Sequence, residues 1–174
     1  MARVYVGIGS NVEPEKHVSL GLRQLRQKFG ALTVSTIYAN PAVGFRGNDF
    51  FNLVVGFDTS LAVFAVAATL RDIEAHFQAR GNGTKQTSRA LDLDLLLYND
   101  LVLQQGTLHI PREEITRYAF VLRPLAEIAG ERQHPLLGTT FAELWAAFDT
   151  SSAEKLTPVA LVPEQYDSDD CRSR

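Results

Sequence analysis

The stretch Arg89-Ala90-Leu91-Asp92-Leu93-Asp94-Leu95-Leu96-Leu97-Tyr98 alternates leucine with aspartate before it becomes wholly apolar. Side chains two residues apart in a strand point to the same face of a sheet. A strand over residues 91–98 would therefore turn one set of leucines toward a core: Leu91, Leu93, Leu95 and Leu97. Asp92 and Asp94 would lie together on the opposite face, where two carboxylates repel each other unless a cation compensates them.

Three further strands and two helices precede this strand in the predicted order of elements. Strands are predicted over residues 3–8, 32–39 and 50–57, which are rich in apolar and β-branched residues. Helices are predicted near Pro14 and after the capping residues 58–60, since apolar residues then recur every three or four positions. The order β-α-β-β-α-β predicts an α+β fold, a ferredoxin-like sandwich with helices on the faces of an antiparallel sheet.

The second half of the chain is expected to complete this sandwich. Residues 101–130 and the helix-like segment 140–147 are candidates to cover the face of the sheet that the first two helices leave open. We divide the chain into a main domain, residues 1–149, and a C-terminal tail, residues 150–174. The tail is expected to be partly disordered because it is rich in Ser, Glu, Lys, Pro and Asp, with residues 156–162 as the part that docks.

The composition is that of an ordinary globular protein. Of the 174 residues, 45% are hydrophobic and 21% are charged, which excludes wholesale disorder, collagen and coiled coil. The net charge of -3 argues against nucleic acid as a partner, because polyanion binders usually carry a basic surplus. No apolar stretch reaches the roughly 18 residues that a membrane span needs. A single cysteine, Cys171, and the lack of an apolar signal region predict a reducing, cytoplasmic location.

The aspartate pair is the first candidate for chemistry. Mg²⁺ is commonly bound by one or two carboxylates together with water and phosphate oxygens, so Asp92 and Asp94 suit this ion. Aspartate is disfavoured in strands, which makes two of them within a leucine strand unusual. Basic residues upstream of the strand would then clamp a polyphosphate: Arg71, Arg80, Lys85 and Arg89. The alternative is an edge strand with a solvated polar face and ordinary surface cations.

Seven segments between residues 3 and 130 follow one another in a characteristic order and spacing. They are Ile8-Gly9-Ser10-Asn11, Tyr38 with Pro41 and Gly44, Phe50-Phe51-Asn52-Leu53-Val54-Val55, Ile73-Glu74, the aspartate strand from Arg89 to Tyr98, Ile110-Pro111, and Phe120-Val121-Leu122-Arg123-Pro124-Leu125. Together they resemble the 6-hydroxymethyl-7,8-dihydropterin pyrophosphokinase family. The Arg-x-Leu-Asp-Leu-Asp-Leu-Leu run is the most specific piece, and the collinear set is stronger than any one motif.

The resemblance implies an activity as well as a fold. Members of this family transfer pyrophosphate from ATP to the hydroxymethyl group of 6-hydroxymethyl-7,8-dihydropterin, give AMP, and act in folate biosynthesis. Residues 1–149 would then be the catalytic domain of an ATP-dependent diphosphotransferase. The family fold is the ferredoxin-like sandwich that the element order predicts independently. The implied partners are the pterin and ATP, without nucleic acid or membrane, and we expect a monomer.

The same resemblance implies roles for individual residues. Asp92 and Asp94 would hold two Mg²⁺ ions and would be catalytic together with Arg89, which would contact phosphate. The pterin, a flat heterocycle rich in amide groups, would be bound by four residues: Pro41, Val43, Asn52 and Phe120. The nucleotide would be bound by four cations: Arg80, Lys85, Arg89 and Arg112. Without the resemblance, Asn52 reads as an ordinary strand residue and Phe120 as a core residue.

Three positions depart from the family pattern. Gln86 stands where a tryptophan is common, and Arg112 follows Pro111 where the family has histidine. Tyr118 stands two residues before Phe120, where the family has arginine. These changes indicate a divergent branch of the family. They leave two alternatives open: a catalytically weak paralogue that binds pterin or nucleotide, and an enzyme that acts on a related hydroxymethyl heterocycle.

Overall fold

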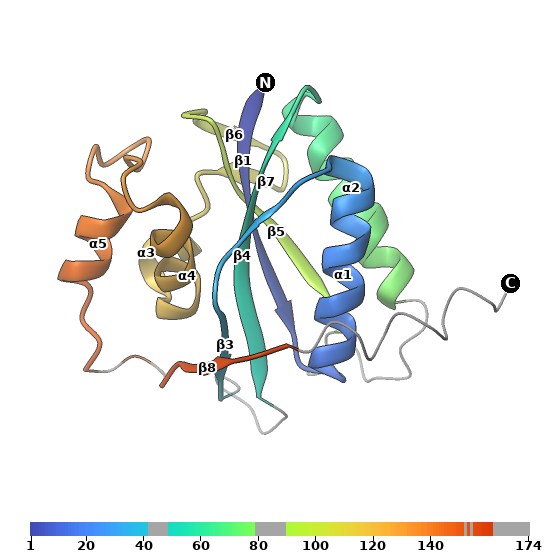
Figure 1. The fold of residues 1–174 in the computed structure, drawn as a ribbon. Coiled ribbons are helices and arrows are strands. Elements are labelled where there is room, and N and C mark those ends of the chain that lie inside the picture. The colour runs from blue at the N-terminus through green and yellow to red at the C-terminus, as the bar shows by residue number, and fades with distance from the viewer. Residues whose placement is uncertain (42–48, 79–89, 152, 154, 162–174) are drawn as a thin grey trace, which may run out of the picture.

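The structure, a computed structural model, describes residues 1–41, 49–78, 90–151, 153 and 155–161. Within these residues the centre is a six-stranded sheet in which every pairing is antiparallel (Figure 1). The strand order is β5 (Asp92–Tyr98), β1 (Ala2–Ser10), β4 (Phe50–Thr59), β3 (Ile37–Asn40) and β8 (Thr157–Val159), and β2 (Thr33–Val34) pairs with β4. A separate hairpin consists of β6 (Leu103–Gln105) and β7 (Leu108–Ile110).

Helices lie on both faces of the sheet (Figure 1). One face carries α1 (Pro14–Phe29) and α2 (Val63–Gln78). The other face carries α3 (Glu114–Arg117), α4 (Ala119–Ala129) and α5 (Phe141–Ala147). The order from β1 through α1, β3, β4 and α2 to β5 confirms the predicted ferredoxin-like α+β sandwich.

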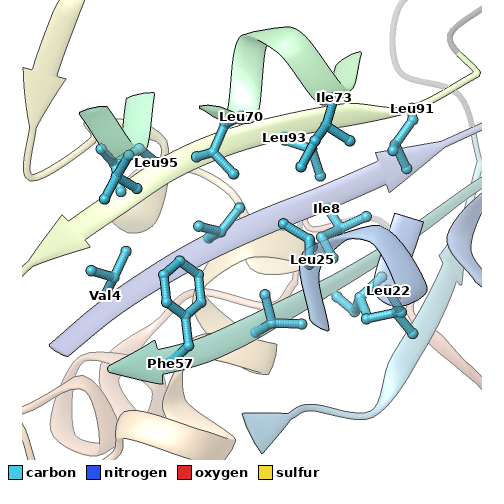
Figure 2. Packing of buried hydrophobic residues seen from close by; sticks show 14 of the residues in the cluster. Val4, Ile8, Leu22, Leu25, Phe57, Leu70, Ile73, Leu91, Leu93 and Leu95 are labelled. Atoms are coloured by element: carbon cyan, nitrogen blue, oxygen red, sulfur yellow. The ribbon is translucent and has the colours of Figure 1, made fainter. Parts of the chain in front are cut away.

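The first layer of the core lies between the sheet and the pair α1 and α2 (Figure 2). It is made by alternate residues of the strands and by the three- and four-residue stripes of the helices. Its members include Val4, Ile8, Leu22, Leu25, Phe57, Leu70, Ile73, Leu91, Leu93 and Leu95. Gly21 lets α1 approach Leu91, the residue just before β5, since a Cβ at that position would lie 3.0 Å from the Leu91 side chain. Leu93 and Leu95 of β5 belong to the same layer as Leu70 and Ile73 of α2.

The second layer lies between the sheet and the three C-terminal helices. Tyr5 and Val54 of the sheet pack there against Leu122, Leu125 and Phe141. The hydroxyl of Thr140 accepts a hydrogen bond from Glu143 N–H and the Glu143 carboxylate accepts one from Thr140 N–H, so a capping box begins α5. These helices cover the face for which residues 101–130 and 140–147 were the predicted candidates.

A β-bulge in β5 corrects the predicted leucine pattern. Val6 of β1 pairs with Leu95, but the preceding Tyr5 pairs with Leu97, so Leu96 is an extra residue in the ladder. Leu96 and Leu97 consequently belong together to the second core layer. The prediction that Leu97 shares the face of Leu91, Leu93 and Leu95 was therefore wrong, because strict two-residue alternation ends at the bulge.

The strand predicted over residues 32–39 is divided in two. Val34 of β2 pairs with Val55, whereas Tyr38 of β3 pairs with Asn52, so the register shifts by one residue between the two strands. Ser35 occupies the break and its hydroxyl accepts a hydrogen bond from Val54 N–H at 2.9 Å. A local side-chain bond of this kind competes with the regular ladder, which explains the interruption.

One segment of the predicted tail joins the sheet. β8 pairs with β3, where Ile37 lies opposite Val159 and Ala39 opposite Thr157. The division of the chain at residue 149 stays a prediction. Among the described helices, none has the length and apolar character that crossing a membrane requires.

Candidate active site

A cavity of about 320 Å³ opens on the second face of the sheet. Strands β1, β4 and β5 line one side of it, and residues at the start of α3 and α4 line the other. Its volume lies at the lower end of the range for small-molecule sites, which suits one flat heterocycle. Five of the predicted site residues line this single cavity: Asn52, Asp92, Asp94, Arg112 and Phe120.

Two glycines form the floor of this cavity. Antiparallel pairing sets Gly9 of β1 directly between Asp92 of β5 and Asn52 of β4, and sets Gly7 opposite Asp94. Because residues that pair directly share a face, the carboxylates and the amide flank a strip of backbone without side chains. Glycine inside a strand often marks a place where a ligand approaches the backbone closely. The floor is therefore open to a planar group.

The amide of Asn52 is oriented by a neighbour that sequence reasoning missed. Its Nδ2 donates to Asn40 Oδ1 at 2.6 Å, and Asn40 Nδ2 donates to the carbonyl of Pro41 at 3.2 Å. Asn40 is almost fully buried and lines the cavity as well. Since Nδ2 of Asn52 is engaged, its Oδ1 lies over the floor, 3.1 Å from where a Cβ of Gly9 would be. The cavity therefore offers an acceptor at a defined position.

The opposite wall of the cavity is aromatic. Tyr118 and Phe120 stack with ring centroids 5.0 Å apart and planes 18° apart, and both line the cavity. Tyr118 is the extended residue that precedes α4, so the start of this helix brings both rings to the cavity. In the sequence, Tyr118 stands out only as a departure from the family pattern. No local pattern distinguishes such a residue, because its role depends on the position of α4 against the sheet.

A group of three side chains ties α4 to the sheet and so sets the width of the cavity. Glu127 of α4 accepts hydrogen bonds from Thr36 N–H and from the hydroxyl of Tyr38. Burial and the neighbouring Glu127 carboxylate raise the pKa of Tyr38 above its ordinary value of 10.0, so this hydroxyl remains a donor. The guanidinium of Arg123 lies 4.6 Å from the centre of the Tyr38 ring, a cation–π contact.

Charged groups meet at one edge of the cavity. Nη2 of Arg112 lies 3.4 Å from Asp94 Oδ1 and 3.2 Å from Glu114 Oε1. The backbone N–H of Arg112 donates to the carbonyl of Leu96, which anchors this residue to β5. Nε of Arg112 is buried and has no hydrogen-bond partner within the part of the chain that the structure describes. Glu114 was missed because nothing in its sequence context separates it from an ordinary surface glutamate.

A second cavity, of about 220 Å³, adjoins the first across β5. It lies between α2 and the β6–β7 hairpin, and its lining includes Arg71, Glu74 and Thr107. Glu74 is held in place because its carboxylate accepts a hydrogen bond from Leu93 N–H. Asp94 and Arg112 line both cavities. Ligands in the two cavities would therefore meet at these two side chains.

The remaining predicted residues are distributed as follows. Pro41 is exposed beside the cavity, and its carbonyl is the acceptor for Asn40. Val43, Arg80, Lys85 and Arg89 lie outside the described residues, so the predictions on them stay predictions. Asp92 and Asp94 provide hard oxygen donors of like charge at the border of an open cavity, and this donor set fits Mg²⁺.

Comparison with known proteins gives consistent matches. The model of the 7,8-dihydro-6-hydroxymethylpterin-pyrophosphokinase family matches residues 5–130. A protein of Pseudomonas aeruginosa is 33% identical over 158 residues, which cover 88% of this chain and 96% of the relative. A protein of Synechocystis is 33% identical over 168 residues, which cover 92% and 86%. Both relatives are named 2-amino-4-hydroxy-6-hydroxymethyldihydropteridine pyrophosphokinase.

Solved structures share the fold. The wild-type HPPK-DHPS of Plasmodium falciparum with pteroate matches with a TM-score of 0.70 at 12% identity, over 83% of this chain. A second HPPK-DHPS structure, in complex with substrates, matches with a TM-score of 0.66 at 13% identity. This chain spans 42% and 43% of the length of those chains. At this level of identity the likeness establishes the fold alone.

Proposed function

This chain belongs to the 7,8-dihydro-6-hydroxymethylpterin-pyrophosphokinase family, and on that premise we propose that it transfers pyrophosphate from ATP to 6-hydroxymethyl-7,8-dihydropterin in folate biosynthesis. The products are AMP and the pterin diphosphate. One observation carries the assignment of the site: two adjoining cavities share Asp94 and Arg112. A two-substrate transfer requires such a junction, where the reacting atoms meet next to charged groups.

The pterin occupies the larger cavity. Its ring lies flat over the backbone of Gly7 and Gly9, with the aromatic wall at Phe120 on its other side. Oδ1 of Asn52 accepts a hydrogen bond from an N–H group at the edge of the ring, and Pro41 and Val43 also contact the pterin. This placement directs the hydroxymethyl group toward the carboxylates.

The nucleotide occupies the second cavity and extends its phosphates toward Asp94 and Arg112. Arg80, Lys85 and Arg89 add positive charge to the phosphates from the segment that precedes β5. Bidentate contacts between guanidinium and phosphate fix orientation as well as charge. Asp92 and Asp94 would hold two Mg²⁺ ions, which would supply neutralisation of the charge that develops on the phosphates.

The reaction itself is a displacement at the β-phosphorus atom. The hydroxymethyl oxygen forms a bond to this phosphorus while the bond to the oxygen bridging the α- and β-phosphorus atoms breaks, and AMP leaves with that oxygen. The hydroxyl proton passes to water as the bond to phosphorus forms. Phosphoryl chemistry of this kind depends on positioning and on charge stabilisation more than on covalent participation. The protein contributes the floor and wall that orient the pterin, and Arg112 and Arg89 as cations beside the phosphates.

A second possibility follows from the two departures that line the cavity, Arg112 and Tyr118. They stand where the family pattern has a histidine and an arginine, respectively. The chain would then be a weak catalyst that binds pterin or nucleotide, or an enzyme for a related hydroxymethyl heterocycle. We further propose a monomer in the cytoplasm that has no nucleic-acid partner.

A single assay separates these functions. Purified protein is mixed with Mg-ATP and 6-hydroxymethyl-7,8-dihydropterin, and the nucleotide product is identified by chromatography. AMP with a diphosphorylated pterin supports the proposed reaction, whereas ADP contradicts pyrophosphoryl transfer. Pterin binding without nucleotide turnover supports the weak paralogue. Turnover that appears only with another hydroxymethyl heterocycle supports the altered substrate.

A further inference from the structure

The contact between Arg112 and Asp94 poses a conflict within the proposed site. Arg112 pairs with Asp94 through a single nitrogen, at 3.4 Å. Asp94 is a metal ligand under the proposed function, on which this inference rests. A guanidinium and a divalent cation repel each other at such a distance, so the two compete for one carboxylate.

Glu114 resolves this conflict. The same Nη2 atom that contacts Asp94 already lies 3.2 Å from Glu114 Oε1. Withdrawal from Asp94 therefore leaves the cation paired, and the anchored backbone of Arg112 does not need to move. The cost of leaving a charge without a partner, which usually opposes such a step, does not arise.

The interactions that hold the Arg112 guanidinium beside Asp94 are weak. Its contacts with Asp94 and Glu114 use one nitrogen instead of the two-pronged geometry that arginine makes with a carboxylate in a strong pair. Nε makes no hydrogen bond within the described residues, although it is buried. The Asp94 side chain is 52% exposed, so the pair is screened by water. Movement of the Arg112 guanidinium from Asp94 to Glu114 therefore breaks only one weak ion pair, the one with Asp94.

We propose that Arg112 is an exchangeable counter-ion, which neutralises Asp94 before the metal arrives and moves to Glu114 and the polyphosphate when the metal–nucleotide complex binds. Arg112 thus disfavours binding of the bare metal and favours binding of the nucleotide. Glu114 is a positioning residue that receives the guanidinium. The arrangement selects for the metal–nucleotide complex over the free ion.

The test measures binding of Mn²⁺ to the full chain by electron paramagnetic resonance, without nucleotide and then with α,β-methylene-ATP. Arg112→Gln is expected to tighten Mn²⁺ alone about two- to fivefold, the range for an exposed ion pair. It is expected to weaken binding of the nucleotide analogue in the presence of Mn²⁺ about tenfold or more. A merely structural role would weaken both. Arg112→Lys keeps the charge and is expected to bind Mn²⁺ alone as the wild type does.

Glu114→Gln tests the receiving partner. It is expected to weaken Mn²⁺ binding in the wild-type background, because Arg112 then stays on Asp94. Removal of the negative charge of Glu114 also weakens Mn²⁺ binding directly. The effect of Glu114→Gln on Mn²⁺ affinity is therefore measured again in the Arg112→Gln background, where only this direct effect of the lost charge persists. An equal effect of Glu114→Gln in both backgrounds overturns the exchange, as does unchanged or weaker Mn²⁺ binding by Arg112→Gln.

Asp94→Asn distinguishes failure of this inference from failure of the proposed function. If Asp94→Asn binds Mn²⁺ as the wild type does, the metal site is elsewhere and the proposed function loses its metal assignment. If Asp94→Asn loses Mn²⁺ but Arg112→Gln does not gain affinity, the metal site stands and the exchange is wrong. Urea unfolding of each variant establishes that it is folded before its affinity is interpreted.

Discussion

Substitution of Gly9 by alanine tests whether the floor of the larger cavity receives the pterin. A Cβ at this position would lie 3.1 Å from Asn52 Oδ1, closer than ordinary van der Waals contact. Gly9 lies in a regular strand and has a negative φ, so alanine fits the backbone there. The methyl group is therefore expected to displace the amide and to obstruct the ring while the fold persists.

The expected magnitude follows from the hydrogen bond that Asn52 would make. A displaced acceptor that leaves a ligand N–H without a partner costs about 1–2 kcal/mol, which corresponds to about 5- to 30-fold in affinity. Gly7→Ala is the matched control, because the three atoms nearest to its Cβ would all belong to the Leu96 side chain, at 3.6–3.7 Å, which is ordinary van der Waals contact. It adds the same volume to the same floor without touching the amide. Its effect is expected to be clearly smaller.

Equilibrium titration of the intrinsically fluorescent pterin measures this difference. Both variants are titrated beside the wild type, and their free energies of unfolding in urea are compared. Equal weakening by Gly9→Ala and Gly7→Ala would show that Asn52 does not bind the ring. Unchanged affinity in both variants would refute the placement of the pterin on the glycine floor.

Three further predictions concern the carboxylates, the aromatic wall and a buried histidine. Asp94→Asn is expected to abolish AMP formation while the free energy of unfolding changes by less than about 1 kcal/mol, since the side chain is half exposed; retained turnover would remove Asp94 from the metal site. Phe120→Leu is expected to weaken pterin binding about 2- to 13-fold, from a stacking contribution of about 0.5–1.5 kcal/mol, and to leave binding of α,β-methylene-ATP unchanged; equal losses for both ligands would argue for a structural role. Burial lowers the pKa of His134 below its ordinary 6.5, so the folded state binds fewer protons than the unfolded state and stability falls as the pH drops below about 6.5. His134→Asn keeps an acceptor for the N–H groups of Leu136 and Leu137 and is expected to reduce the difference in urea midpoint between pH 7.5 and pH 5.5, whereas an unchanged difference would assign that loss to other groups.

Periodic patterns of apolar residues predict helices and strands well where the periodicity is unbroken along the element. The helix that begins at Pro14 and the strand that carries Asp92 and Asp94 were both anticipated, because periodicity depends only on neighbours along the chain. The same rule failed at Leu97, where the bulge at Leu96 breaks the alternation. It also failed at Ser35, whose hydroxyl bonds across to β4. Both exceptions depend on a partner strand that the local sequence does not reveal.

The features of the candidate site also fall into two groups, those that local sequence patterns predict and those that depend on contacts between elements. The order of the elements, the common face of the two aspartates and, through the collinear motifs, the family all follow from the amino-acid sequence. The orientation of Asn52 by Asn40 and the position of Glu114 beside Arg112 depend on the folded arrangement of the strands and helices. Antiparallel register and helix docking create these contacts between residues with no shared pattern, because each contact depends on how two elements meet in space.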